Sequence, residues 1–337
     1  MNILITGIHG FVGSNLVAAL KAQHTIYGLD IVSPLKDGVF KTYGWKELKD
    51  IPGIDCVIHL AGKAHDTKNQ TNAQVYFEIN TGLTQRIYDY FQTSQATKFI
   101  FFSSVKAVAD QVEGILTEEH IPATQGPYGE SKLAAENYIL SHLPSVLSST
   151  NSSGNVATQG VDFRVPSPDS GLRSSDKRVF ILRPCMIHGP GNKGNLNLLY
   201  KVVNKGIPWP LGAFENKRSF TSVDNLSFVI GQLIEKDIEP GIYHLADDEA
   251  LSTNELVELI SQSQGKKTAV WKLPQGYIKG LARIGDLLRL PLNSERLTKL
   301  TESYMVSNEK IKKALEIAKM PVTAKAGMKK TLDSFKK

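Results

Sequence analysis

The sequence TGIHGFVG, residues 6–13, joins a short apolar run to the start of a helical pattern. The run before it, NILIT, is too short for a helix and is typical of a buried strand, whereas residues 11–22 carry apolar side chains at helical spacing. A strand, a glycine turn and a helix in succession place backbone N–H groups at a helix N-terminus, where a pyrophosphate can bind. In such a turn Gly7 allows the tight bend, Gly10 lets the phosphates approach, and Gly13 lets the helix pack closely on the sheet.

Asp30 supports a dinucleotide site. It ends a second apolar run, residues 24–30, about 20 residues after the glycines, where a carboxylate accepts hydrogen bonds from an adenosine ribose. The same carboxylate repels a 2′-phosphate, and residues 31–33 provide no arginine to bind one. We therefore predict NAD rather than NADP as the cofactor. From this stretch alone, a glycine-rich turn without a ligand and a solvated aspartate at a strand end remain alternatives.

Strands and helices alternate along the next part of the chain. Apolar runs at residues 55–62, 98–104 and 178–184 predict strands, and helical patterns cover about 74–93 and 127–142. This alternation is typical of βαβ units with a parallel sheet covered on both faces. We therefore predict an α/β fold, a Rossmann-type doubly wound parallel sheet with a smaller C-terminal substrate-binding subdomain.

The chain is expected to divide near residue 185. Residues 1–185 would form the NAD-binding domain and residues 186–337 mainly the substrate-binding subdomain, with about 219–247 returning to the first. Residues 145–177 hold nine serines and no sustained periodicity, which predicts a mobile surface insertion, with a substrate lid as the alternative. Later patterns predict helices at 195–206, 225–236 and 251–262 and a strand at 241–248.

Composition restricts the function classes. Of 337 residues, 41% are hydrophobic and 21% charged, which is ordinary for a soluble globular protein. The net charge of +6 fits an anionic small substrate, but it is too diffuse to indicate nucleic-acid binding. Much of it comes from lysines near the C-terminus, interpreted as a solvated helical surface, with a membrane or polyanion contact as the alternative. No apolar run is long enough to span a membrane, and we expect a cytoplasmic protein.

The chain contains two cysteines, Cys56 and Cys185. Both lie in apolar runs and are expected to be small buried core residues. Their number and spacing resemble neither a disulfide framework nor a metal-ligand cluster, so we predict no metal site.

PYGESK places a tyrosine and a lysine four residues apart. If Pro127 opens the helix, Tyr128 and Lys132 lie one turn apart on one face. A tyrosine holds its proton to about pH 10, and a nearby ammonium together with a cationic nicotinamide lowers that pKa toward the range of a general base. Ser104 follows the fourth predicted strand, at the sheet edge where ligands bind, and its hydroxyl could bond the substrate oxygen. An exposed helical Tyr–Lys pair is the structural alternative.

These motifs together resemble the extended short-chain dehydrogenase/reductase family, which includes nucleotide-sugar epimerases, dehydratases and 4-keto reductases. TGIHGFVG, DCVIHLAG, FFSSVK, YGESK, LRPCMIHGPG and RSFTSVDNL occur in this order over roughly residues 1–230. The resemblance implies that Tyr128 is the acid/base, that Lys132 holds the nicotinamide ribose and tunes Tyr128, and that Ser104 binds the sugar O4.

The resemblance also implies two binding sets. The cofactor would contact Gly7, His9, Gly10, Phe11, Val12, Gly13, Asp30, Leu60, Ala61, Gly62, Asn80 and Lys132. The substrate would contact Ser104, Lys106, Tyr128, Asn195, Arg218 and Arg296, with the two arginines gripping the nucleotide diphosphate.

Several residues keep a structural alternative. Asn80 could simply tie a helix to a loop. We interpret His59 and His188 as satisfied core histidines, because both follow apolar strands. Lys63 and His65, just after the third predicted strand, could equally face the substrate or the solvent.

The reaction is narrowed to redox chemistry at sugar C4. A UDP-hexose or UDP-N-acetylhexosamine 4-epimerase is the first hypothesis, and a UDP-4-keto-sugar reductase of polysaccharide biosynthesis is nearly equal to it. Met186 stands where epimerase-like members have an asparagine, which weakens the epimerase hypothesis. KAH (63–65), SSVK (103–106) and GPGNKGN (189–195) resemble the reductase branch more, and Val105 and Lys106 argue against dehydration. A non-catalytic NAD-binding regulatory protein is the third hypothesis. The family resemblance suggests a homodimer.

Overall fold

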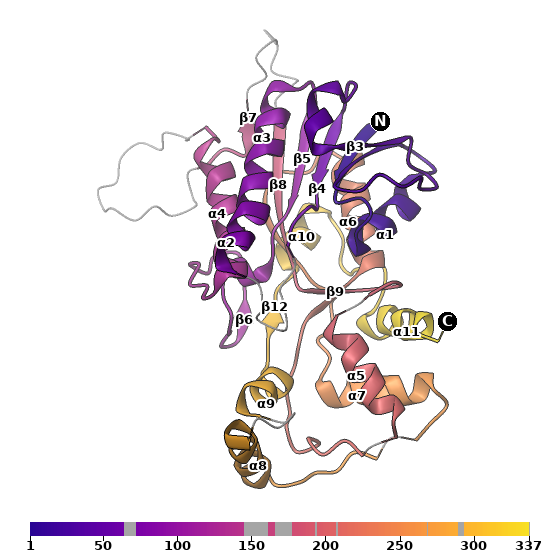
Figure 1. Ribbon diagram of the computed structural model, residues 1–337, viewed down its shortest axis with the longest axis vertical. Coiled ribbons are helices and arrows are strands. Elements are labelled where there is room, and N and C mark those ends of the chain that lie inside the picture. The colour runs from indigo at the N-terminus through magenta and orange to yellow at the C-terminus, as the bar shows by residue number, and fades with distance from the viewer. Residues whose placement is uncertain are drawn as a thin grey trace, which may run out of the picture.

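The computed structural model describes residues 1–63, 72–144, 161–165, 177–192, 194–206, 208–267, 269–288 and 293–336. A mainly parallel sheet lies at its centre, with the strand order β11–β8–β5–β4–β1–β2–β3 and β7 paired antiparallel to β8 (Figure 1). The strands are β1 Asn2–Thr6, β2 Thr25–Asp30, β3 Lys41–Gly44, β4 Cys56–His59, β5 Lys98–Phe102, β7 Arg164–Val165, β8 Lys177–Pro184 and β11 Gly241–Leu245. Because β1 pairs with both β2 and β4, the strand order reverses at its carboxyl end, where such sheets bind ligands.

Both faces of the sheet are covered by helices, as the Rossmann-type prediction requires. On β1, Ile3 and Ile5 point to one core with α1 (Phe11–Leu20) and α6 (Val223–Glu235). Leu4 points to the opposite core with α3 (Leu83–Thr93) and α4 (Pro127–Ser141). Side chains alternate across a strand, so the continuous apolar runs of the sequence supply both cores. Figure 1 shows α3 and α4 on one side of the strands and α1 and α6 on the other.

One predicted strand and one predicted helix differ from the observed elements, and one observed strand was not predicted. The predicted strand 55–62 ends early, at His59, because Thr6 Oγ1 accepts the N–H groups of Leu60 and Ala61 and draws them away from the sheet. The helix predicted at 74–93 is divided into α2 (Ala73–Tyr76), a π-helical turn (Phe77–Gly82) and α3. Strand β3 was not predicted.

The serine-rich segment predicted at 145–177 lies largely outside the described residues. Its described part, residues 161–165, includes β7, whose Arg164 and Val165 pair with Arg178 and Lys177. This part is therefore attached to the sheet rather than free of it. The predicted mobility of the remainder stays a prediction.

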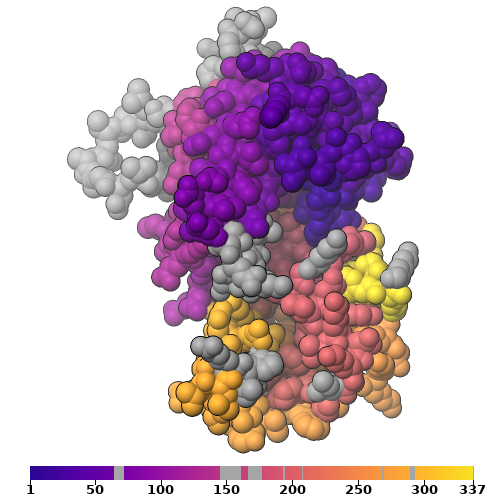
Figure 2. Space-filling view, in the orientation of Figure 1, coloured from indigo at the N-terminus to yellow at the C-terminus, as the bar shows by residue number. Residues whose placement is uncertain are grey.

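The smaller elements lie mostly in the C-terminal part. These are a 3₁₀ turn Trp45–Asp50, a 3₁₀ turn Val105–Ala107, β6 Ile115–Leu116, β9 Met186–His188, α5 Asn195–Asn204, β10 Phe220–Ser222, α7 Thr253–Ser263, α8 Gln275–Leu288, α9 Ser294–Thr301, β12 Met305–Val306, α10 Glu309–Ala314 and α11 Ala324–Ser334, with the first three lying in the N-terminal half. β9 pairs with β10 and β6 with β12. Figure 2 shows the N-terminal residues filling the upper part of the molecule and the C-terminal residues the lower part. The domain boundaries predicted from the sequence remain a prediction, although β11 and α6 pack with the sheet.

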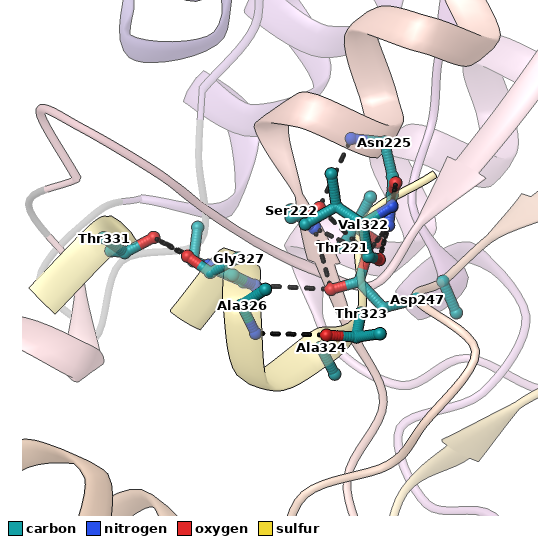
Figure 3. A network of polar contacts seen from close by, with 12 residues as sticks. Thr221, Ser222, Asn225, Asp247, Val322, Thr323, Ala324, Ala326, Gly327 and Thr331 are labelled. Carbon is teal, nitrogen blue, oxygen red and sulfur yellow. Dashed lines mark hydrogen bonds and ion pairs between the residues drawn. The ribbon is translucent and has the colours of Figure 1, made fainter. Parts of the chain in front are cut away.

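A polar network after β11 fastens the C-terminal segment to the sheet (Figure 3). The Asp247 carboxylate accepts hydrogen bonds from the N–H of Ser222 (3.0 Å) and from Asn225 Nδ2 (2.7 Å). Asn225 in turn pairs with both backbone groups of Val322, just before α11. His188 is buried, as predicted, but only one of its two ring nitrogens is satisfied: Nδ1 bonds Thr331 of α11, whereas Nε2 lies 3.5 Å from Asp247 and has no hydrogen-bond partner among the described residues.

Two lysines, one buried and one half-buried, donate to the carbonyl groups that helices leave unpaired at their C-termini. Lys177 of β8 donates to the carbonyls of Phe91, Gln92 and Ser94 at the end of α3. Lys98 of β5 does the same for the end of α6. Within the described part of the chain, no helix is both long and apolar enough to cross a bilayer.

Replacement of Lys177 by methionine tests this capping. Lys177→Met keeps most of the side-chain length but leaves three carbonyls without their donor, so we expect the free energy of unfolding to fall by about 1–3 kcal/mol. Urea unfolding measures the difference, and Lys46→Met at an exposed position is the control. Equal stability of the two variants would show that water replaces the ammonium without loss.

Candidate active site

The glycine turn has the strained geometry that only glycine accepts readily. Gly7 has φ +67° and donates its N–H to Leu29 O at 2.8 Å. A Cβ on Gly13 would lie 2.6 Å from Gly7 O and 2.7 Å from Ile8 O, so a side chain there would push α1 off the turn. Gly10 precedes the helix in an extended conformation.

The start of α1 offers free donors to an anion. Gly10 provides no side-chain cap, and the first turn contains no acidic residue. The N–H groups of Phe11 and Val12 have no acceptor within their own helix, because the first four N–H groups of an α-helix never do. The residues present therefore fit a pyrophosphate. Asn15 Nδ2 donates to Pro190 O at 3.2 Å, which places the segment after β9 against this helix start.

Asp30 lies at the end of β2 beside the turn. Its carboxylate accepts the N–H of His9 (3.0 Å) and the N–H of Ile31 (2.7 Å), which fixes its orientation. The sequence did not single out Lys36, whose ammonium bonds Ser14 Oγ (2.6 Å) and Ile8 O (3.1 Å). Burial lowers the pKa of Lys36 and the nearby Asp30 carboxylate opposes that shift. Lys36 is thus a cation close to Asp30, although residues 31–33 themselves contain no cation.

His59 is a structural histidine, as expected from the sequence. Its Nδ1 lies 2.7 Å from Thr6 Oγ1 and its Nε2 lies 2.9 Å from Thr84 Oγ1. Burial, followed by the nearby Lys132 ammonium, holds the pKa of His59 well below its usual value. The ring is therefore neutral and joins β1, β4 and α3.

Asn80 forms the tie that the sequence offered as an alternative, and it lies on the π-helical turn. Its Oδ1 accepts the N–H of Lys63 (2.7 Å), and its Nδ2 donates to Ser131 Oγ (2.9 Å) on α4. A Cβ on Gly62 would lie 2.8 Å from Asn80 Oδ1 and 3.2 Å from Lys132 Nζ. Gly62, Asn80 and Lys132 therefore meet at one point, and π turns are frequent at functional sites. His65 lies outside the described residues.

The predicted catalytic residues converge beside this point. Pro127 opens α4, and Tyr128 and Lys132 follow on its first two turns. Tyr128 is hydrogen bonded to Ser104, and the ring of Tyr76 packs edge-on at 6.2 Å. Burial raises the pKa of Tyr128, which the bond from Ser104 partly offsets. The sequence predicts a lowered pKa for Tyr128, whereas the chain without a cofactor raises it. A lowered pKa therefore requires an added positive charge.

Lys132 is the buried cation of the site. Its ammonium donates to Phe102 O at 2.9 Å, at the end of β5. Burial lowers its pKa to about 8, while Glu136, one turn further along α4, acts in the opposite direction. Glu136 is itself fully buried, paired to Arg183 Nη2 at 2.5 Å and bonded by Ser103. The lysine is thus held between a strand end and a buried ion pair.

Lys106 and Arg218 form a second cationic group. Lys106 donates to Asp110 O (2.6 Å) and lies 4.7 Å from the centre of the Tyr304 ring. Burial lowers the pKa of Lys106, the Asp110 and Glu302 carboxylates oppose that shift, and the Arg218 guanidinium adds to it, so the two cations are neighbours in a cluster that also holds two carboxylates. Arg218 Nη1 donates to Lys299 O of α9 at 2.7 Å. Two adjacent, partly buried cations suit a diphosphate.

The remaining predicted substrate residues lie on the surface. Arg296 is exposed on α9, about one turn before Lys299, and Asn195 is exposed at the first position of α5. Their assignment to the substrate stays a prediction. Cys56 and Cys185 are buried free thiols, as expected, and burial raises the pKa of both. Within the described ranges, no group of His, Cys, Asp and Glu side chains is arranged to hold a metal ion.

The buried charge on Lys132 has a consequence for stability. Its folded pKa of about 8 lies below its ordinary value of 10.5, so below pH 8 the folded chain carries a buried charge that destabilises it. We expect Lys132→Met to raise the free energy of unfolding at pH 7 by about 2 kcal/mol, after allowing for the lost hydrogen bond. The gain should shrink as the pH rises from 8 and disappear near 10.5, because the wild type then loses the buried proton.

Urea unfolding at pH 7 and pH 10 measures this effect, with Lys46→Met as the exposed control. A Lys132→Met variant that is less stable than the wild type at pH 7 would show that Glu136 more than compensates for burial.

Comparisons with known proteins agree with this geometry. Residues 3–146 match the model of the NAD dependent epimerase/dehydratase family. The chain is 29% identical to the UDP-glucose 4-epimerase of Vibrio cholerae, over 99% of this chain and 95% of that protein. It is 26% identical to the N-acetyl-alpha-D-glucosaminyl-diphospho-ditrans,octacis-undecaprenol 4-epimerase of Escherichia coli O157:H7, over 93% of this chain and 85% of that protein.

A solved structure shares the fold. MoeE5 in complex with UDP-glucuronic acid and NAD superposes with a TM-score of 0.70, covering 100% of this chain and 99% of that chain at 19% identity. The glycine turn, Ser104, Tyr128 and Lys132 all lie in the segment matched by the family model. These residues therefore lie in the part of the chain that is similar to the NAD dependent epimerase/dehydratase family.

Proposed function

We propose that the chain is an NAD-dependent nucleotide-sugar 4-epimerase, acting on a UDP-linked hexose or N-acetylhexosamine. The observation that carries the proposal is the convergence of Ser104, Tyr128 and Lys132 at the carboxyl edge of the sheet, beside the glycine turn. The relatives named as UDP-glucose and lipid-linked N-acetylglucosamine 4-epimerases support the reaction class.

The cofactor would be held by the residues that fit it. The start of α1 would bind the pyrophosphate, and Asp30 would bind the adenosine ribose. Lys132 would bind the nicotinamide ribose, and Gly62 and Asn80, which lie beside Lys132, would border that end of the cofactor. When bound, NAD supplies the acceptor and donor of the hydride at sugar C4. The likeness to MoeE5, whose complex contains NAD, supports this choice.

Tyr128 would move the proton of the sugar O4. The phenol is hydrogen bonded to Ser104, so a substrate hydroxyl placed between them can lose its proton to Tyr128 and later recover it. With a pKa near 8, Lys132 is still charged at pH 7, and it lies one turn after Tyr128 on α4. Lys106 and Arg218 would bind the diphosphate, and Asn195 and Arg296 would reach the nucleotide from the surface.

A lipid-linked sugar diphosphate is a second candidate substrate. The relative from Escherichia coli is named for such a substrate, and helix α8 of this chain exposes an apolar face that a membrane could cover. We also propose that the protein is a homodimer and that it is cytoplasmic, as expected from the sequence.

Tyr128→Phe tests the proposal directly. Purified protein is incubated with UDP-glucose and with UDP-N-acetylglucosamine, and ¹H NMR follows the sugar while absorbance follows reduced nicotinamide. We expect interconversion at C4 without net cofactor use, and a loss of about 10²–10⁴-fold in Tyr128→Phe because the proton transfer is removed. Tyr138→Phe, on the same helix, is the matched control and should keep its activity.

Other outcomes identify the alternatives. Stoichiometric oxidation of NADH or NADPH with a 4-keto UDP-sugar, without epimerisation, would assign the chain as a reductase. Binding of NAD without turnover of any nucleotide sugar would favour a regulatory protein. Unchanged turnover in Tyr128→Phe would remove the tyrosine from the mechanism.

A further inference from the structure

His59 lies between two hydroxyl groups whose own hydrogen bonds fix the form of its ring. Its Nδ1 is 2.7 Å from Thr6 Oγ1. That oxygen already accepts the N–H groups of Leu60 (3.1 Å) and Ala61 (2.9 Å), which occupy both lone pairs of a hydroxyl group. Thr6 must therefore donate its own hydrogen to Nδ1, so Nδ1 carries no proton.

The opposite side of the ring requires the same form independently. His59 Nε2 lies 2.9 Å from Thr84 Oγ1, which donates its hydrogen to Asn80 O at 2.6 Å. A carbonyl oxygen can only accept, so the Thr84 hydrogen is already used and Nε2 must be the donor. The ring is therefore neutral and protonated on Nε2. A charged ring would face a Thr6 oxygen without a free lone pair, and it would add a second positive charge near Lys132.

The hydrogen bonds continue from this ring to helix α4. Asn80 lies on the π-helical turn, and its Nδ2 donates to Ser131 Oγ at 2.9 Å. Ser131 Oγ in turn donates to Tyr128 O, also at 2.9 Å. The five side chains of this series are completely buried: Thr6, His59, Thr84, Asn80 and Ser131. A group that loses its partner here cannot turn to bulk water, so each bond restricts where its neighbours can lie.

We propose that His59 is a positioning residue, whose ring fixes the segment after β4 relative to the π-helical turn and the start of α4. One ring nitrogen reaches the segment through Thr6, and the other reaches the turn through Thr84. The ring is stacked on Phe101 with 5.6 Å between the two centroids, so its plane is fixed as well. An apolar side chain at this position could fill the space but could make neither hydrogen bond.

This connection reaches the proposed cofactor site from two sides. Leu60 and Ala61 are predicted from the sequence to contact the cofactor, and Asn80 lies beside Gly62 and Lys132. Without the ring, these two borders of the site are no longer fixed relative to each other, which weakens the binding of NAD. The consequence for the cofactor rests on the proposed function, whereas the protonation of the ring does not.

Nitrogen NMR of the full chain tests the form of the ring. In protein labelled with ¹⁵N-histidine, a long-range ¹H–¹⁵N spectrum at pH 7 distinguishes the two neutral forms from the charged ring. The His59 signals are identified by their absence in His59→Phe and by their shift in Thr84→Val, which removes the hydroxyl group bonded to Nε2. We expect a neutral ring protonated on Nε2. A ring protonated on Nδ1, or a charged ring, would overturn the proposal.

The affinity for NAD tests the positioning. His59→Phe keeps an aromatic ring against Phe101 but makes neither hydrogen bond, so we expect the dissociation constant for NAD in isothermal titration calorimetry to rise about tenfold. The matched control is His244→Phe. His244 is also completely buried, near the end of β11, but its ring nitrogens have no hydrogen-bond partner among the described residues. This control should bind NAD as the wild type does, and circular dichroism confirms that both variants are folded.

Unchanged NAD affinity in His59→Phe would refute the positioning role, and so would an equal loss in His244→Phe, because the effect would then come from core packing alone. If His59→Phe does not fold, Thr84→Val breaks the same connection at Nε2 and takes its place in the titration. Turnover is measured separately. A wild type with the Nε2-protonated ring and NAD binding that depends on His59, but without turnover of any nucleotide sugar, would refute only the proposed epimerase reaction.

Discussion

The buried ion pair between Glu136 and Arg183 holds together the elements that carry the proposed catalytic groups. Glu136 lies on α4 one turn after Lys132, and Arg183 lies near the end of β8, with both side chains almost completely removed from water. Ser103 donates to the same carboxylate and immediately precedes Ser104. Removal of one partner from a buried pair costs about 3–5 kcal/mol, so α4 cannot shift relative to the strand ends without a large loss.

This fastening matters because the site is electrostatically costly. Burial raises the pKa of Tyr128 and lowers that of Lys132, which means that the interior opposes the charged form of both groups. His59, the next titratable group behind them, is kept neutral by burial and by Lys132, so it adds no second positive charge. A rigid arrangement of such perturbed groups at the edge of a sheet is common in active sites. Within the chain it is the hydrogen bond with Ser104 that lowers the pKa of Tyr128, so the positive charge that would stabilise its phenolate must come from a bound cofactor.

The sequence predicts most of the sheet and the central site because their signals are local. β1, β5 and β8 are continuous apolar runs, and Tyr128 and Lys132 sit on one helix behind a proline. β3 was missed because KTYG is a short edge strand with only Tyr43 buried. The π turn around Asn80 depends on contacts with Lys63 and α4 that are distant in sequence, and no periodicity announces it.

Cations are the residues whose roles are hardest to assign from sequence. Lys36 and Lys177 look like ordinary surface lysines in the sequence, yet one bonds the glycine turn and the other caps α3. Arg218 could be placed by its motif, whereas Arg296 had only a weak pattern and lies exposed on α9. The difference is that a lysine or arginine carries no periodic signal, and its partner is a carbonyl fixed only by the tertiary fold.

The position of the substrate side depends on the same sheet. Asp247 directly follows β11 and its carboxylate binds Ser222 and Asn225, while Asp248 and Glu249 accept the N–H groups of Met320 and Ala324 (Figure 3 shows the Asp247 part). The backbone of Arg218 then pairs with Leu251, two residues beyond that acidic run. Arg218 is thus attached through Leu251 to the segment that follows β11, and β11 pairs with β8, the strand that carries Arg183. The candidate diphosphate site and the buried ion pair behind the proton-transfer groups are therefore connected through neighbouring strands of one sheet.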